Sequence, residues 1–275
     1  MRIDESGVGA LAQSISAAQF EEPEPMDLEL AVTFNALNFG SGWHPHLDKE
    51  PGASGSVTML SRLRRRFDRE GPFAAAELVH LTAEDCALLF GQRLQPPVDE
   101  LMDLFALSLN DLGRFLLDRF DGSFDSLVDD AGASAARLVE LLVEMPMYRD
   151  VASYEGRTVP FLKRAQLTAS DIGGFDDLDR LTLFADNLIP HVLRIEGVLA
   201  FDGAVVAAIE RGALLEAGGQ AETEMRAAAV HAVELVVGEL GGLVTPRELD
   251  HFLWRRGQEP RFKASPRPRV RTVFY

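Results

Sequence analysis

The stretch PVDELMDLFALSLNDLGRFLLDRF, residues 97–120, decides the fold class. Its apolar residues recur three or four positions apart, a spacing that places them on one face of an α-helix. Pro97 stands near the start, where a helix tolerates proline because its first N–H groups have no intrahelical partner. The apolar face consists of Leu101, Leu104, Phe105, Leu109, Leu112, Phe115 and Leu116. The stretch therefore predicts a long helix with one side in a hydrophobic core.

The same periodicity extends over much of the chain. It recurs in residues 81–90, 134–145, 222–240 and 245–256. The last of these opens with Thr245 as N-cap, Pro246 as first helical residue and Glu248 at the capping-box position. Strand signals are few: TVPFL (158–162) and VRTVFY (270–275) are short runs compatible with β-structure. We therefore predict an all-α fold, mostly helical with few short strands.

Length and composition suggest how the chain is divided. Hydrophobic residues make up 47% of the 275 residues, which is enough for one large domain or two packed lobes. The segment EEPEP (21–25) reads as a break in the chain. We expect residues 1–25 to be a loosely ordered N-terminal segment. Residues 26–275 then form a single helical domain, with any functional site between its lobes if it has two.

The composition also limits the class of partner. The first residues carry acids where a secretory signal would carry bases, and no apolar run is long enough for a membrane span. A single cysteine, Cys86, cannot form an internal disulfide, so we expect a soluble, cytoplasmic protein without membrane contact. The net charge of −16 argues against long nucleic acid as a partner. The sequence contains no dinucleotide, P-loop, HExxH or CxxC motif, and we expect neither cofactor nor metal.

A lone carboxylate, Asp186, stands in RLTLFADNLIPHVLR (180–194) between an apolar run and the next periodic stretch. As a helix cap it would accept a hydrogen bond from the backbone N–H of Leu188 or Ile189. It could also be a charge held in a pocket for chemistry. The two interpretations are compatible, because the positive end of the helix dipole favours an ionised carboxylate.

Two further segments carry side chains suited to a site. VPFLKRAQ (159–166) contains Lys163 and Arg164; neighbouring side chains on a helix diverge, so at most one of them faces a pocket with Asp186. LNFGSGW (37–43) offers the rings of Phe39 and Trp43 and the amide of Asn38. Aromatic rings can stack on a nucleobase, and they can equally anchor a core. Residues 261–275 contain several arginines and a lysine but no acidic residue. Such a segment fits either a solvated face or a pocket for an anion.

Taken in order, several segments resemble the queuosine salvage proteins, the queuosine 5′-phosphate N-glycosylases. They are LNFGSGW (37–43), YEGRTVPFLKRAQ (154–166), LTLFADNLIPHVL (181–193), ETEMRA (222–227), LDHFLW (249–254) and RPRVRTVFY (267–275). The resemblance covers most of the chain from about residue 30 onward. It implies a helical fold related to the helix-hairpin-helix DNA glycosylases. It also implies hydrolysis of queuosine 5′-monophosphate to queuine and ribose 5-phosphate, in the salvage of queuine for tRNA modification.

Carried over position by position, the resemblance assigns the catalytic aspartate to Asp186 and the accompanying lysine to Lys163. The substrate contacts that it suggests are Asn38, Phe39, Trp43, Arg164, Gln166, Asn187, His191, Arg271 and Tyr275. The chain departs from the family at two of these, where Asn187 replaces an aromatic residue and His191 a glutamine. The basic tail, with Arg267, Arg269 and Arg271, is a pool of groups for the 5′-phosphate.

Two other functions remain open at this point. The first is a DNA-repair glycosylase on the same helical scaffold, which the acidic charge disfavours. The second is a non-catalytic helical protein that binds a nucleotide, in which Asp186 is merely a cap. The sequence carries no signal for an oligomeric state.

Overall fold

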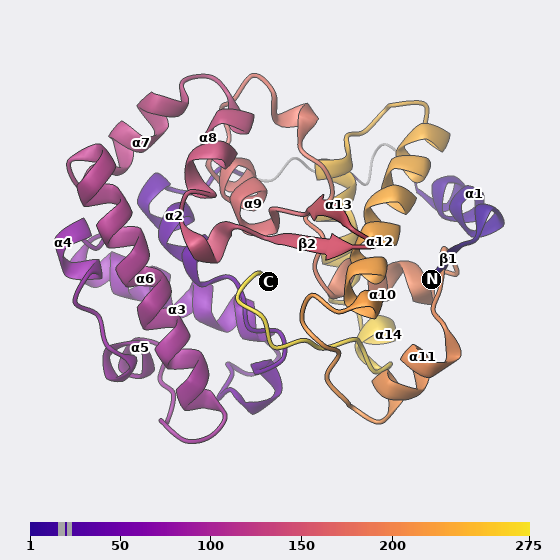
Figure 1. Ribbon diagram of the computed structural model, residues 1–275, viewed down its shortest axis with the longest axis horizontal. Helices are drawn as coiled ribbons and strands as arrows, with labels where there is room; N and C mark the ends of the chain where they lie inside the picture. The colour runs from indigo at the N-terminus through magenta and orange to yellow at the C-terminus, as the bar shows by residue number, and fades with distance from the viewer. Residues whose placement is uncertain (16–19, 21–23) are drawn as a thin grey trace.

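The computed structural model describes residues 1–15, 20 and 24–275 (Figure 1). The described residues form fourteen α-helices and four short strands, so the mostly helical fold is confirmed. The helices are α1 (Glu5–Ser14), α2 (Leu28–Leu37), α3 (Gly55–Glu70), α4 (Ala75–Leu78), α5 (Ala83–Leu89), α6 (Val98–Phe120), α7 (Phe124–Ala131), α8 (Ala135–Leu142), α9 (Lys163–Ile172), α10 (Leu188–Ile195), α11 (Gly203–Glu210), α12 (Gln220–Glu239), α13 (Pro246–Arg256) and α14 (Pro260–Lys263). The strands are β1 (Arg2–Ile3), β2 (Val151–Tyr154), β3 (Arg157–Pro160) and β4 (Leu199–Ala200).

The helices with the clearest sequence signals lie where the periodicity predicts them. The long stretch at 97–120 is α6, and its Leu101, Phe105 and Leu109 are fully buried. The capping box at the start of α13 is also confirmed: Glu248 N–H donates to Thr245 Oγ1 at 3.3 Å, and Thr245 N–H donates to Glu248 Oε2 at 2.7 Å. Helix periodicity and capping depend on residues a few positions apart, so they can be predicted from the local sequence.

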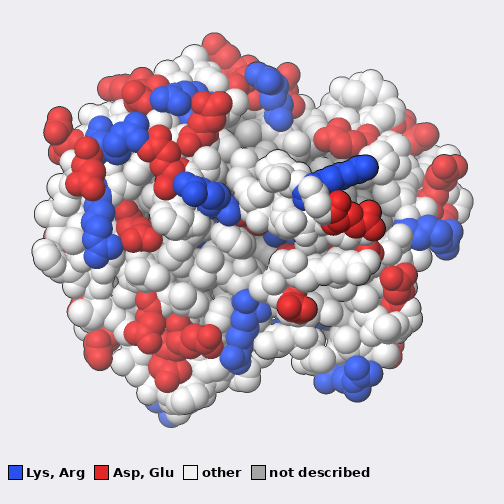
Figure 2. All heavy atoms as spheres, viewed as in Figure 1, with Lys and Arg blue, Asp and Glu red and all other residues white. Residues whose placement is uncertain are grey.

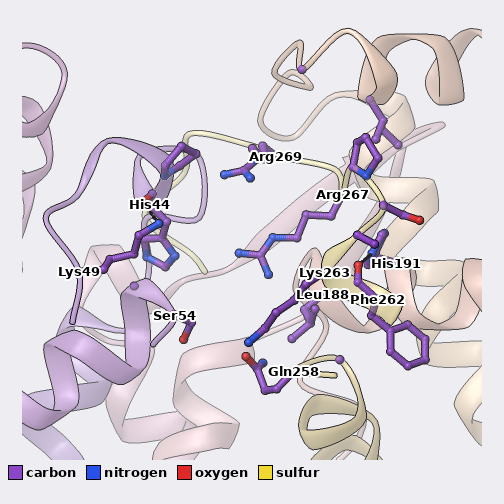
Figure 3. Close-up of a pocket in the computed structure, with 18 of the residues that line it drawn as sticks. His44, Lys49, Ser54, Leu188, His191, Gln258, Phe262, Lys263, Arg267 and Arg269 are labelled. Atoms are coloured by element: carbon purple, nitrogen blue, oxygen red, sulfur yellow. Dashed lines mark hydrogen bonds between the residues drawn. The ribbon is translucent and has the colours of Figure 1, made fainter. Parts of the chain in front are cut away.

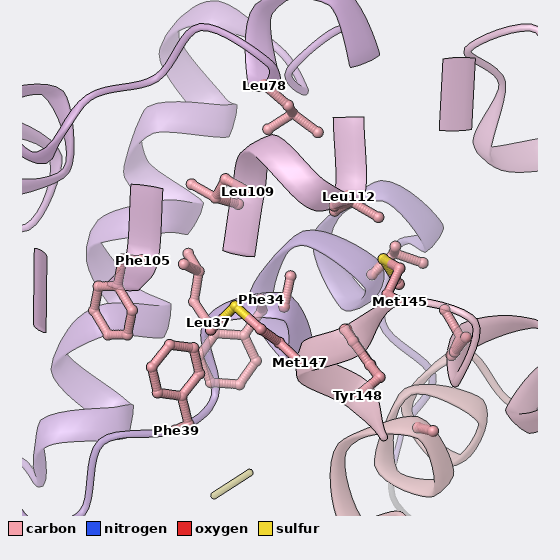
Figure 4. Packing of buried hydrophobic residues seen from close by; sticks show 14 of the residues in the cluster. Phe34, Leu37, Phe39, Leu78, Phe105, Leu109, Leu112, Met145, Met147 and Tyr148 are labelled. Carbon is pink, nitrogen blue, oxygen red and sulfur yellow. The ribbon is translucent and has the colours of Figure 1, made fainter. Parts of the chain in front are cut away.

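Two hydrophobic cores organise the molecule. The first core is built from α2 to α9, and Figure 4 shows part of it, with Phe34, Leu37 and Phe39 of the α2 end facing Phe105 and Leu109 of α6. The second core is built from α1, α10, α12, α13 and α14. In Figure 1 the elements of the first core form the left half of the molecule, and those of the second core form the right half, where the indigo α1 lies beside the orange-to-yellow helices. Burial of apolar helix faces against each other drives each half together.

Two segments run between the halves. Strands β2 and β3 pair as an antiparallel hairpin, and β2 reaches α12 of the second half (Figure 1). The tail after α14 crosses back to the first half, where Gly40 N–H donates to the carbonyl of Tyr275 at 3.0 Å. The run at 270–275, which the sequence shows to be compatible with β-structure, forms no strand: its one β-contact is an isolated bridge between Val270 and Leu215.

The N-terminal residues pack against the second half. Strand β1 pairs with β4, and α1 lies on α12 with Val8 and Leu11 buried. Residues 16–19 and 21–23 of the predicted N-terminal segment lie outside the described residues, and the boundary at residue 25 stays a prediction. No helix within the described part of the chain is long and apolar enough to cross a membrane. On the face in Figure 2, acidic side chains are spread over both halves and basic ones form no continuous patch.

Candidate active site

Asp186 lies at the turn that leads into α10. Its Oδ1 accepts hydrogen bonds from the backbone N–H groups of Leu188 at 2.7 Å and Ile189 at 3.2 Å, so the capping interpretation is confirmed. The side chain is partly exposed, whereas its neighbours Ala185 and Asn187 are buried. Because both bonds use Oδ1, the other oxygen of a rigidly held carboxylate can serve a substrate.

Lys163 is the first residue of α9 and is buried beside Asp186. Its ammonium group donates to the carbonyl of Asn38 at 3.4 Å. Burial lowers the pKa of the Lys163 ammonium below its usual range, and the carboxyl groups of Asp186 and Asp250 oppose that shift. The fold therefore brings Lys163 of α9 and Asp186 of the turn before α10 into the same electrostatic environment.

A second acidic residue near this pair, Asp250 of α13, was not predicted. Its Oδ1 accepts the backbone N–H of Phe184 at 3.2 Å, and the residue is buried. Burial and the neighbouring Asp186 raise the pKa of the Asp250 carboxyl group well above its ordinary value. The surroundings of Asp250 therefore favour its protonated form. The only sequence signal was the segment LDHFLW, in which this position looks like part of an ordinary amphipathic helix.

Asp171, at the end of α9, provides a test of this buried electrostatic environment. Asn35 Nδ2 donates to its Oδ2 at 2.8 Å, and burial raises the pKa of the carboxyl group from 3.8 to about 6. The folded chain holds this proton more tightly than the unfolded chain does. Ionisation of Asp171 therefore lowers the free energy of unfolding as the pH rises from about 4 to about 6. An asparagine at this position could keep the bond to Asn35 without a charge.

We therefore expect Asp171→Asn to stabilise the protein at neutral pH. The difference in unfolding free energy should grow to at most about 3 kcal/mol by pH 8, because each pKa unit corresponds to about 1.4 kcal/mol. It should shrink as the pH falls toward about 5. Urea unfolding of both proteins at several pH values measures it. A difference that does not change with pH would contradict the assigned pKa.

The aromatic residues expected to stack on a base are packed in the first core. Phe39 is 1% exposed and meets Phe105 edge-on at a centroid distance of 5.1 Å. Trp43 is 2% exposed, and its Nε1–H donates to Glu100 Oε2 at 2.9 Å. Asn38 lies between this core and the site, since its carbonyl meets Lys163. The stacking role of the two rings stays a prediction.

Arg164 points away from Lys163 into the first core, as the divergence of neighbouring helical side chains predicts. Its guanidinium donates to the carbonyls of Ala36 at 2.6 Å, Asn35 at 3.2 Å and Met147. It also lies over the ring of Phe39, 4.8 Å from the centroid. Buried guanidinium groups need such partners because an unpaired charge is costly in a core. The structure does not bring Arg164 to Asp186.

Four other predicted contact residues form hydrogen bonds between segments around the site. Gln166 Oε1 accepts the backbone N–H of Thr182 at 2.9 Å and so joins α9 to the segment before Asp186. The remaining three contact the tail or α14, or belong to the tail. Asn187 Nδ2 donates to the carbonyl of Pro268 at 2.6 Å, His191 Nε2 lies 2.9 Å from the carbonyl of Phe262, and Arg271 donates to Glu100 at 3.2 Å. The bond from Asn187 ties the tail to the turn that holds Asp186, and the bond from Arg271 ties it to α6.

The last predicted contact, Tyr275, is buried in a polar cluster. Its hydroxyl donates to Glu222 Oε1 at 2.9 Å, and Glu222 also accepts from Arg226 at 3.2 Å. Burial, with Glu222 adjacent, raises the pKa of the Tyr275 hydroxyl well above its ordinary value. Tyr275 is therefore a neutral donor. Arg226 and Glu222 belong to ETEMRA, whose polar residues look like the exposed face of a helix in the sequence.

A basic pocket of about 650 Å³ opens between the halves (Figure 3). Four of its lining residues are cationic: Lys49 from the first half, Lys263 from α14, and Arg267 and Arg269 from the tail. Figure 3 shows the Arg267 side chain extending into the space between the two walls. Burial lowers the pKa of Arg267, and the nearby Asp186 opposes that shift, so this pocket borders the candidate site.

The two histidines of the pocket do not add to its charge. Burial, with the positive charges around it, lowers the pKa of His44 to about 3, and burial lowers that of His191 to about 4. Both are neutral at physiological pH, so the attraction for an anion comes from the lysines and arginines. Among the described residues, no group of three or more His, Cys, Asp or Glu side chains is placed to hold a metal ion.

The chain is similar to one family of known proteins over nearly its whole length. A family model described as "Queuosine salvage protein" matches residues 24–275. A queuosine 5′-phosphate N-glycosylase/hydrolase of Sphaerobacter thermophilus is 31% identical over 99% of this chain and 92% of its own length. Proteins of the same name from Mus musculus and Bos taurus are 34% and 32% identical, over 99% and 81% of this chain and 83% and 72% of their own lengths. The chain belongs to the queuosine salvage protein family.

Proposed function

We propose that this protein is an N-glycosidase that hydrolyses queuosine 5′-monophosphate to queuine and ribose 5-phosphate. The observation that carries the proposal is the setting of Asp186, a fixed, partly exposed carboxylate beside a buried lysine and a basic pocket. The names of the relatives support the same substrate. The proposal includes a cytoplasmic location, release of queuine for tRNA modification and an arrangement of helices related to the helix-hairpin-helix DNA glycosylases.

In the proposed mechanism, Asp186 acts on the sugar. Breaking the bond between C1′ and the base nitrogen builds positive charge on C1′ and the ring oxygen. A carboxylate held nearby stabilises that charge and orients the attacking water. The water oxygen bonds to C1′, and a proton equivalent to the one that the water loses ends on the base nitrogen. Since Asp186 is fixed by two backbone N–H groups, it needs little reorganisation during the reaction.

Lys163 and the pocket supply the positive charge. The charge of Asp186 favours the protonated form of Lys163, whose ammonium group can contact the sugar hydroxyls. The 5′-phosphate then enters the basic pocket. Among the residues that line the pocket, Arg267 is the arginine for which the charge of Asp186 opposes the lowering of the pKa by burial. Arg271, which belonged to the sequence-based pool for the phosphate, is instead engaged with Glu100 and lies over Trp43.

Replacing Arg267 by methionine tests the assignment of the phosphate. We expect KM for queuosine 5′-monophosphate to rise about 10- to 100-fold, as for the loss of a charged hydrogen bond, whereas cleavage of unphosphorylated queuosine should change little. Arg261→Met is the matched control, because Arg261 pairs with Glu196 at 2.8 Å outside the pocket. An equal loss on both substrates would remove Arg267 from the phosphate site.

The class of substrate is tested by comparing the nucleotide with DNA. We expect queuine release from queuosine 5′-monophosphate, no base release from a damaged DNA duplex and no retention on DNA at low salt. The charge of −16 and the absence of a continuous basic patch on the face in Figure 2 support this expectation. Base release from the duplex alone would instead establish the DNA-repair function.

A further inference from the structure

Arg226 of α12 is buried at the junction of the two halves and touches neither Asp186 nor Lys163 by a hydrogen bond. The side chain is 2% exposed. Its Nη1 and Nη2 donate to Asp150 Oδ1 and Oδ2 at 2.9 and 2.5 Å, a bidentate ion pair. Its Nε donates to the carbonyl of Ala185 at 2.9 Å. One guanidinium therefore joins the segment before β2 to the segment before α10.

Each of these partners leads to one residue of the candidate site. Asp150 Oδ2 accepts the backbone N–H of Lys163 at 3.2 Å and so caps α9. Ala185 directly precedes Asp186 in the chain. The link from Arg226 to Lys163 passes through one carboxylate, and the link from Arg226 to Asp186 passes through one carbonyl. A shift of the guanidinium would change the position of Lys163 relative to Asp186.

The start of α9 needs this support. Leu162, the residue before Lys163, has a φ of +51°, in the left-handed region. A non-glycine residue there costs about 1–2 kcal/mol, and leucine has no side-chain group to cap the helix. Asp150 supplies the missing cap, and its backbone carbonyl also accepts the N–H groups of Phe161 at 2.9 Å and Leu162 at 3.2 Å.

The surroundings keep the guanidinium charged and in one orientation. Its carbon lies 3.9 Å from the ring centroid of Phe161 and 4.6 Å from that of Tyr275, so the two rings enclose it. Burial lowers the pKa of Arg226, but Asp150 and Glu222 outweigh this effect and the pKa is raised. A lysine ammonium could keep the charge, but it lacks the planar set of donors that reaches Asp150 and Ala185 together.

We propose that Arg226 is a positioning residue, which holds Lys163 and Asp186 in the geometry that the cleavage reaction requires. The inference rests on the proposed function. A side chain that only stabilised the fold would affect the amount of folded protein. A positioning residue must also affect the chemical step in molecules that are folded, because small displacements of catalytic groups slow a reaction strongly.

The test is Arg226→Lys, assayed with queuosine 5′-monophosphate at a temperature where the variant is folded. We expect kcat to fall about 10- to 100-fold while KM changes less than about threefold, since the substrate pocket is intact. Arg66→Lys is the matched control. Arg66 is also a mostly buried arginine, which bonds the carbonyl of Gly71 and lies 3.7 Å over the ring of Phe73. That variant should lose stability and keep kcat.

A second variant guards against failure of Arg226→Lys to fold. Asp150→Asn keeps an acceptor oxygen and a similar shape but loses the bidentate charge pair, and it should also lower kcat more than KM. In the double variant the two losses should not multiply, because both changes break one link. A wild-type kcat in folded Arg226→Lys or in Asp150→Asn would overturn the inference while the function stands. A wild-type protein that releases no queuine would overturn both.

Discussion

Replacing Asp186 by asparagine is expected to lower kcat for queuine release by about 10³- to 10⁴-fold, the scale of losing a key charge-stabilising group. The fold should be almost unaffected. Asparagine caps helices as well as aspartate does, and its Oδ1 can accept the same N–H groups of Leu188 and Ile189. The substitution therefore removes the charge and keeps the geometry. Circular dichroism and Tm, recorded on the assayed samples, check that the variant is folded.

Asp177→Asn is the matched control for this experiment. Asp177 also holds a helix start, because its carboxylate accepts the backbone N–H of Ala135 at 2.5 Å and the hydroxyl of Ser134 at 2.9 Å. Its carboxylate bonds Ser134, Ala135 and Ala136 at the start of α8, and its replacement should leave kcat unchanged. If Asp186→Asn and Asp177→Asn were equally active, Asp186 would be a cap only, and the mechanism proposed for it would be wrong.

Replacing Lys163 by methionine is expected to lower kcat by about 10²- to 10³-fold, as for loss of one preorganised charged group. Methionine fills a similar volume but leaves Asp186 without its cationic neighbour. Because burial lowers the pKa of Lys163, the wild-type rate should fall on the alkaline side at a pH below the usual range for lysine. That alkaline decline should vanish in Lys163→Met.

A pH–rate profile of both proteins measures this effect. The direction follows from the charge, since the active form of Lys163 is the protonated one and is lost as the pH rises through its pKa. A folded Lys163→Met protein that kept both a near-normal kcat and the alkaline decline would contradict the role of the ammonium group.

Sequence patterns predicted what depends on near neighbours. The face of α6 and the capping box of α13 were readable because helix periodicity and caps act over a few residues. The hydrogen bonds of Asp186 to Leu188 and Ile189 belong to the same class. The run at 270–275 is compatible with β-structure, but whether such a run becomes a strand depends on a partner strand, which its own sequence cannot reveal.

The rest of the site depends on contacts between distant segments. Arg164 and Lys163 are adjacent in sequence, yet one enters the first core and the other meets Asp186. Asp250 and Arg226 each occupy helices whose polar residues look solvent-exposed in the sequence, and both are buried only because α12 and α13 pack between other elements. Their roles follow from burial and partners, which are properties of the fold.

The most direct test of the central claim is to identify and count the products that the wild-type protein forms from queuosine 5′-monophosphate. Chromatography with mass detection separates queuine, ribose 5-phosphate, queuosine and inorganic phosphate. We predict queuine and ribose 5-phosphate in equal amounts, because the bond that breaks joins C1′ to the base. Queuosine with inorganic phosphate would show cleavage of the phosphate ester, and no product at all would show that the protein does not cleave this nucleotide. Either result would contradict an N-glycosidase that acts through Asp186.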